Sequence, residues 1–185
     1  RRSYVLGAEE AGFLNWEYFP LNDIGQSVNS IRSAEIRWTS GLVLQLAKGL
    51  QAETSYQYWN NSATRENYNS PESYFSRNLI NTFSQLGETG SFVYPVPQGA
   101  ILDRASSEGV SHQFRSLIRY SGTFGKHRIN ALSGFEAKDY RSNSYSNRFY
   151  GYNPELASTI PVDYINTYPY SYNPSLLRIS RFQQD

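Results

Sequence analysis

The stretch LVLQLAKGLQAETSYQYW at positions 42–59 alternates apolar and polar side chains. Leu42, Leu44 and Leu46 fall on one parity, and the alternation resumes after Gly49. Successive side chains of a strand point to opposite faces, so a period of two on both sides of a tight turn predicts a β-hairpin. The apolar face of that hairpin must meet either a protein core or lipid.

The first hairpin is predicted to have strands near 36–47 and 50–60. A three-residue loop, Ala47-Lys48-Gly49, pairs Leu46 with Leu50 and keeps the two faces distinct, whereas a two-residue loop mixes them. A loop of this length favours glycine at its last, left-handed position, which is where Gly49 stands.

A second hairpin is predicted from strands near 112–124 and 129–140. The four residues between them would form the turn and pair Phe124 with Ile129. One face of this hairpin carries Arg115, Arg119 and Glu136, and we expect Glu136 to lie within reach of one of the two arginines. Burying such a charged network in the core of a soluble protein is energetically costly, whereas the water-exposed inner wall of a membrane barrel accommodates it.

The opposite face of both hairpins is apolar, with an aromatic margin formed by Trp38, Tyr56 and Tyr58. Membrane barrels carry such aromatic girdles, short turns on one side and long loops on the other. We therefore predict an all-β chain, part of a transmembrane antiparallel β-barrel, with 60–111 and 141–185 as extracellular loops. The alternative is a β-sandwich whose hairpins cover a core.

Residues 70–87 predict one short helix inside the first long loop. Ser70 is the expected N-cap, Pro71 the first helical position and Gly87 the end. The apolar residues at helical spacing are Phe75, Leu79, Phe83 and Leu86. Three further segments are expected to lack regular strands: 91–102, which contains two prolines, 150–174, and 1–30 apart from a candidate strand near Ser3–Gly7.

Composition excludes several functions. The chain of 185 residues has no cysteine and a net charge of +1, which gives no general attraction to nucleic acid. Its two histidines, His112 and His127, are expected near opposite ends of one strand, so they cannot share a metal. No nucleophile, phosphate-binding or paired-carboxylate motif is present, so we expect no enzyme, no cofactor and no nucleic-acid partner. No apolar run reaches the roughly 18 residues of a spanning helix.

The order of short motifs along residues 31–170 resembles the barrel portion of SusC/RagA-type TonB-dependent outer-membrane transporters. The motifs that carry the resemblance are KGLQAETSYQYW, SYFSRNLINTFSQ, YPVPQGAILD, RSLIRYSGTFGKHRINALSGFE, YGYNPEL and PVDY.

The resemblance implies a barrel of about 22 strands closed by a plug in the bacterial outer membrane. It also implies import of glycan or peptide oligomers, energy from the TonB complex and a SusD-like surface lipoprotein as lid. This chain has no plug and too few strands to close a barrel, so residues 1–185 are expected to be a partial barrel domain. The competing functions are a secreted carbohydrate-binding β-sandwich and a TonB-dependent receptor for siderophores or vitamin B12.

Aromatic side chains that alternate with amides suggest ligand contacts, because flat rings stack on sugars or peptide groups and amides bind their polar groups. Trp59 is expected to end its strand facing the lumen. The candidate ligand-binding residues are Trp59, Tyr68, Tyr74, Tyr150 and Tyr152, with Asn60, Asn61 and Asn153 among them.

Overall fold

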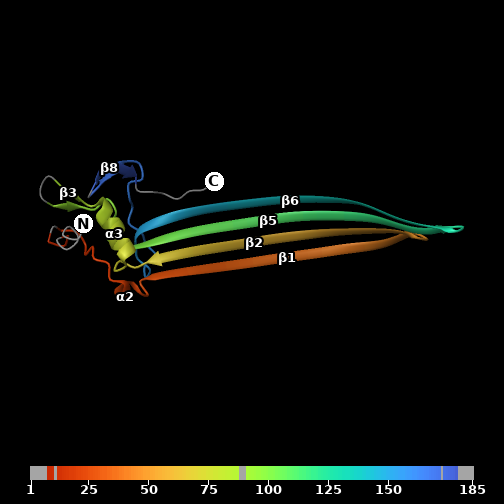
Figure 1. Ribbon diagram of the computed structural model, residues 1–185, viewed down its shortest axis with the longest axis horizontal. Coiled ribbons are helices and arrows are strands. Elements are labelled where there is room, and N and C mark those ends of the chain that lie inside the picture. The colour runs from red at the N-terminus through yellow and green to blue at the C-terminus, as the bar shows by residue number, and fades with distance from the viewer. Residues whose placement is uncertain (1–7, 11, 88–90, 172, 179–185) are drawn as a thin grey trace. The chain divides into compact units, whose positions relative to one another are not determined.

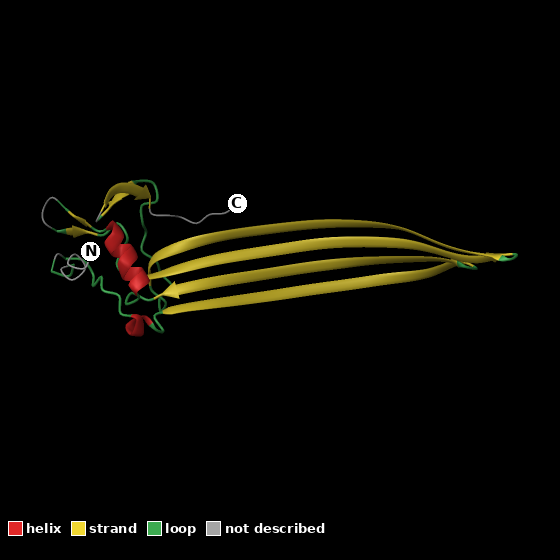
Figure 2. Ribbon diagram, in the orientation of Figure 1, coloured by secondary structure: helices red, strands yellow, loops and turns green. Residues whose placement is uncertain are grey.

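The computed structural model describes residues 8–10, 12–87, 91–171 and 173–178. The described chain is predominantly β, with two helices, α2 (Pro20–Asp23) and α3 (Tyr74–Phe83) (Figure 2). Four long strands form one sheet in the order β1-β2-β5-β6 (Figure 1). Their bounds are β1 Ser27–Ala47, β2 Leu50–Asn69, β5 Ala100–Phe124 and β6 His127–Tyr152.

Both predicted hairpins are present, but every strand runs further from its turn than the sequence indicated. Residues 60–69, 100–111 and 141–152 belong to strands, so the predicted boundaries of the long loops were wrong. These extensions carry few apolar side chains at alternating positions, and backbone pairing rather than an amphipathic pattern holds them in the sheet.

The first turn follows the expected chemistry. Gly49 adopts a φ of +80°, the left-handed conformation predicted for it. Trp38 and Tyr56 contact one another with ring centroids 5.9 Å apart, so they lie on one face as the predicted pairing requires. Strand β1 extends to Ala47, one residue closer to the turn than the predicted loop allowed.

The predicted four-residue loop of the second hairpin was wrong. Only Gly125-Lys126 separate β5 from β6, so Phe124 lies opposite His127 rather than Ile129. Gly125 has a φ of +58°, which suits the first position of a two-residue type II′ turn. The pairing moves by two residues, and because two is the period of a strand, every side chain keeps its predicted face.

The two turn glycines should differ in their tolerance of substitution. A Cβ at Gly49 would lie 2.1 Å from the Ser121 carbonyl oxygen, whereas a Cβ at Gly125 would meet nothing within 4 Å. Gly125→Ala should therefore lower the free energy of unfolding by about 1–2 kcal/mol, because alanine disfavours the positive φ at this position. We expect Gly49→Ala to cost clearly more in a denaturant titration, and equal losses would contradict the clash.

The chain divides into two compact units. Unit 1 comprises Arg1–Ile31, Thr64–Ser106 and Tyr145–Asp185, and unit 2 comprises Arg32–Ala63 and Ser107–Ser144. Unit 2 contains both turns and the adjoining halves of the four long strands.

One side of the unit 2 sheet, which we call the apolar face, collects the even-numbered residues of β1, β2 and β5 and the odd-numbered residues of β6. Contacts of Tyr56 with Trp38 and with His112 join three of the strands on this face. Its apolar members are Ile36, Trp38, Leu42, Leu44, Leu46, Leu50, Ala52, Tyr56, Tyr58, Phe114, Ile118, Tyr120, Phe124, Ile129, Ala131, Phe135 and Ala137.

The described residues of unit 2 form a single sheet, and the other sheets of the described chain are two short pairs in unit 1, β3-β4 and β7-β8. Leu42 is 53% exposed, Ile118 49% and Phe135 63%. A soluble sandwich would bury such side chains against a second sheet, whereas a barrel wall would expose them to lipid. Neither helix in the described part of the chain has the length and apolar character needed to cross a membrane.

Unit 1 has its own core, formed by α3 and the segments around it. The buried members of this core are Ile80, Phe83, Val96, Ile101 and Tyr150. The side chain of Asn81 exchanges hydrogen bonds with the backbone of Leu14, 2.9 Å from the Leu14 nitrogen and 2.8 Å to its carbonyl oxygen. The N-terminal segment is thereby fastened to the helix.

The predicted bounds and face of the helix need correction. Ser73, not Ser70, is the N-cap, because its hydroxyl accepts the Ser76 N–H, while the Ser70 hydroxyl accepts the Ser73 N–H in the turn ahead. The helix ends at Phe83, before the predicted Gly87, and Ser84 bonds back to its last turn. Phe75 and Leu86 are 38% and 67% exposed, so they do not form the buried face.

Short strands occur where none was predicted, one of them in the predicted helical segment 70–87. β3 (Gln85–Leu86) pairs with β4 (Phe92–Val93), and β7 (Thr167–Tyr170) pairs with β8 (Asn173–Arg178), both antiparallel. Pro95 and Pro97 stay outside strands, as expected from their missing N–H groups. The candidate strand near Ser3–Gly7 lies outside the described residues.

Candidate functional site

The other side of the unit 2 sheet, which we call the polar face, carries the expected contact between Glu136 and Arg115. The Arg115 Nε lies 3.9 Å from Glu136 Oε2, and the Gln113 amide donates to Glu136 Oε1 at 2.8 Å. Arg119 does not contact Glu136 and instead lies 3.5 Å from Glu53. With the corrected turn Glu136 lies opposite Arg115. Arg119 therefore pairs with Glu53 on the neighbouring strand, β2.

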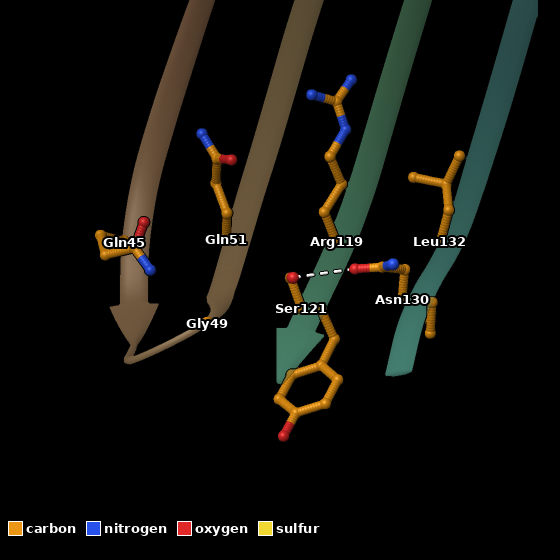
Figure 3. A pocket seen from close by; sticks show the side chains of 9 residues that line it. Gln45, Gly49, Gln51, Arg119, Ser121, Asn130 and Leu132 are labelled. Carbon is orange, nitrogen blue, oxygen red and sulfur yellow. Dashed lines mark hydrogen bonds between the residues drawn. The ribbon is translucent and has the colours of Figure 1, made fainter. Parts of the chain in front are cut away.

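The polar face is hollowed near the turns, where all four strands contribute side chains (Figure 3). The hollow has a volume of about 500 Å³, and the Ser121 hydroxyl donates to Asn130 Oδ1 at 2.8 Å within it. Its labelled lining residues are Gln45, Gly49, Gln51, Arg119, Ser121, Asn130 and Leu132. The lining combines amides, a hydroxyl and one guanidinium with the apolar side chains of Leu132 and Ala131.

Further from the turns, a second hollow of about 320 Å³ surrounds Trp59. The expectation that Trp59 ends its strand was wrong, because β2 continues to Asn69. The Trp59 ring lies against Tyr140, with ring centroids 6.1 Å apart and planes inclined by 35°. Asn60 and Asn61 follow Trp59 within the same strand rather than in a loop.

Unit 1 brings together two of the other candidate tyrosines. Tyr68 and Tyr152 form an edge-to-face pair with centroids 6.3 Å apart. Burial raises the pKa of Tyr68 above its usual 10.0, and the charge of Glu72 raises it further. Tyr74 begins α3 and packs on Tyr18 with centroids 4.9 Å apart.

Tyr150 is a core residue and does not present its ring to a ligand. It is 1% exposed and lies among the buried residues of unit 1. The sequence suggested a loop tyrosine because its neighbours are glycine and asparagine, whereas β6 carries it into the core. Asn153 shapes a turn, since its Oδ1 accepts the N–H of Glu155 at 2.9 Å.

Unit 1 also contains an ion pair that the sequence did not predict. The Arg148 guanidinium donates to both carboxylate oxygens of Asp103, at 2.5 and 2.9 Å, and stacks 5.4 Å from the Phe75 ring centre. Burial alone would lower the pKa of Arg148, but its hydrogen bond to Asp103 and the charge of that carboxylate raise it. Arg148 and Asp103 are 45 positions apart in the sequence, so no local pattern of residues indicated this contact.

The described residues contain no group of three histidine, aspartate or glutamate side chains placed to hold a metal ion. No protein-family model matches the chain, and a search of curated proteins finds none with significant similarity. The arrangement in unit 2 is therefore the main basis for a function: a sheet with one exposed apolar face and one polar, ion-paired face.

Proposed function

We propose that this chain is part of the wall and the extracellular loops of a bacterial outer-membrane transporter that imports glycan or peptide oligomers. On this proposal the apolar face of unit 2 meets lipid and the polar face lines the lumen. The remaining strands, the plug and the TonB-contacting segment belong to other parts of a longer chain. The order of short motifs that resembles SusC/RagA-type transporters supports the same assignment, with a SusD-like lipoprotein as partner.

The observation that carries the proposal is the extent of the apolar face. Its apolar residues occupy 36–46, 50–58, 114–124 and 129–137 on the four strands. Each range is close to the roughly 9–11 residues with which a tilted strand crosses a bilayer. No charged residue lies on this face inside those ranges.

The borders of the apolar face also fit a membrane. At one border Tyr56 and Tyr58 contact His112, with the Tyr56 hydroxyl 2.7 Å from His112 Nδ1, and Trp38 packs against Tyr56. Beyond that border the same face becomes charged, with Arg32, Glu108, Asp139 and Arg141. Amphipathic rings at the edge of an apolar band, followed by charge, mark a lipid–water interface.

The import function can be tested in bacteria that produce the full-length protein. We expect it to remain in the outer-membrane fraction after a carbonate wash and to migrate faster on a detergent gel when it is not boiled. Uptake of an oligosaccharide or peptide oligomer should be lost when TonB is deleted.

The outcomes separate the alternatives. Release by carbonate would contradict the membrane assignment and favour a secreted module. Retention in the membrane together with uptake of iron chelates or vitamin B12, and not of oligomers, would favour a receptor for those ligands.

A further inference from the structure

The hollow around Trp59 on the polar face has the features of a binding site. We propose that it binds the carboxylate-bearing sugar rings of an acidic oligosaccharide. This inference rests on the proposed function, because it takes the polar face to be open to the solution that the transporter samples. It narrows the substrate class from oligomers in general to acidic glycans.

The aromatic part of the site is built on small residues. Trp59 and Tyr140 come from strands on either side of β5, where Ser111 is buried between them at 6% exposure. A Cβ at Gly109 would lie 3.4 Å from the Trp59 ring and 3.3 Å from the Tyr140 hydroxyl. The missing side chain at Gly109 therefore lets both rings lie close to the sheet as a platform for a sugar ring.

Trp59 also carries a polar group with no partner. Its indole Nε1 is buried and makes no hydrogen bond among the described residues. A buried indole N–H normally has an acceptor, and the oxygen of a bound sugar would supply one only if the Trp59 ring turns to bring its N–H into the hollow.

The charged side chains that line the hollow are both cationic. Arg37 lines the hollow from β1 and Lys138 from β6, and no carboxylate lines it. Arg37 is already paired with Glu35 at 2.9 Å, whereas no ion pair joins Lys138 to a carboxylate in the described part of the chain. Gln57 adds an amide group that suits sugar hydroxyls, whereas the Gln113 amide already donates to Glu136.

Binding can be measured on the full-length protein in detergent by titration calorimetry with tetragalacturonate. The neutral probe is the same tetrasaccharide with its carboxyl groups reduced to hydroxymethyl groups. We expect tetragalacturonate to bind more tightly than the neutral probe. Lys138→Gln should weaken tetragalacturonate binding roughly fivefold, the effect of one partly exposed ion pair, and leave the neutral probe unchanged.

Two further variants sharpen the test. Trp59→Leu should weaken both probes, since it removes the stacking surface, and its faster migration without boiling would show that it still folds. Lys126→Gln makes the same charge change in the second turn, outside the hollow, and should change neither affinity.

The proposal is wrong if the wild type does not bind tetragalacturonate, binds the neutral probe equally well, or loses no affinity in Lys138→Gln. Each of these results would leave the membrane assignment untouched, because carbonate washing and gel migration report that assignment independently of any ligand.

Discussion

Replacing Leu42 with arginine should destabilise the folded protein in a bilayer by about 2–4 kcal/mol, the cost of a charge near the midplane on the lipid face of a barrel. Leu42 lies near the middle of the apolar range on β1, and its side chain is 53% exposed with no protein cover among the described residues. In water such a position would tolerate arginine readily, so a large loss requires lipid around it.

Val43→Arg is the matched control for that substitution. Val43 is the next residue, is equally aliphatic and is 56% exposed, but it lies on the polar face with Glu53. Its arginine would remain in water beside a carboxylate, so we expect a change within about 0.5 kcal/mol. Urea unfolding of the full-length protein in lipid vesicles measures both variants, and equal effects would contradict a lipid-facing surface.

The hairpins of unit 2 could be predicted because strand periodicity and turn glycines are local signals. The alternation of apolar and polar residues assigned each side chain to a face of the sheet. These assignments hold although the four-residue loop was wrong, because the pairing shifted by two residues, which is one full period of a strand. What alternation could not supply was the pairing between the two hairpins. The contact between Arg119 and Glu53 joins β5 to β2, and residues 70–99 separate those strands in the sequence.

Unit 1 was predicted poorly because its structure depends on contacts between distant segments. Tyr150 looked like a ligand-binding residue by composition, yet it is buried with Ile80 and Ile101. Ser70 satisfied the sequence rule for an N-cap, but Ser73 lies three residues before an N–H that it can accept, and the helix starts there. The hollow around Trp59 needed both the sheet order and the small residue at Gly109, neither of which alternation reveals.

Removing the charge of Asp103 should lower the free energy of unfolding of unit 1 by about 3 kcal/mol. The reason is that breaking a buried ion pair leaves the charge of Arg148 buried without the opposite charge of Asp103. The side chains of Arg148 and Asp103 are only 13% and 27% exposed. Asp103→Asn keeps the shape of the side chain and removes its charge, so the Arg148 guanidinium beside Phe75 of α3 would lose its ion pair with Asp103. We expect the amides of α3 to exchange with solvent faster, by roughly the hundredfold that about 3 kcal/mol implies.

Glu66→Gln is the control within the same unit. Glu66 lies 2.7 Å from Arg104, but their side chains are 32% and 43% exposed, so water can replace the lost charge. Its expected cost is at most about 1 kcal/mol, with little change in the exchange of α3 amides. Matching exchange rates in the two variants would mean that water reaches Arg148 as freely as Arg104. The two pairs differ in their degree of burial, and burial, rather than the number of ion pairs, should therefore decide how firmly α3 is held.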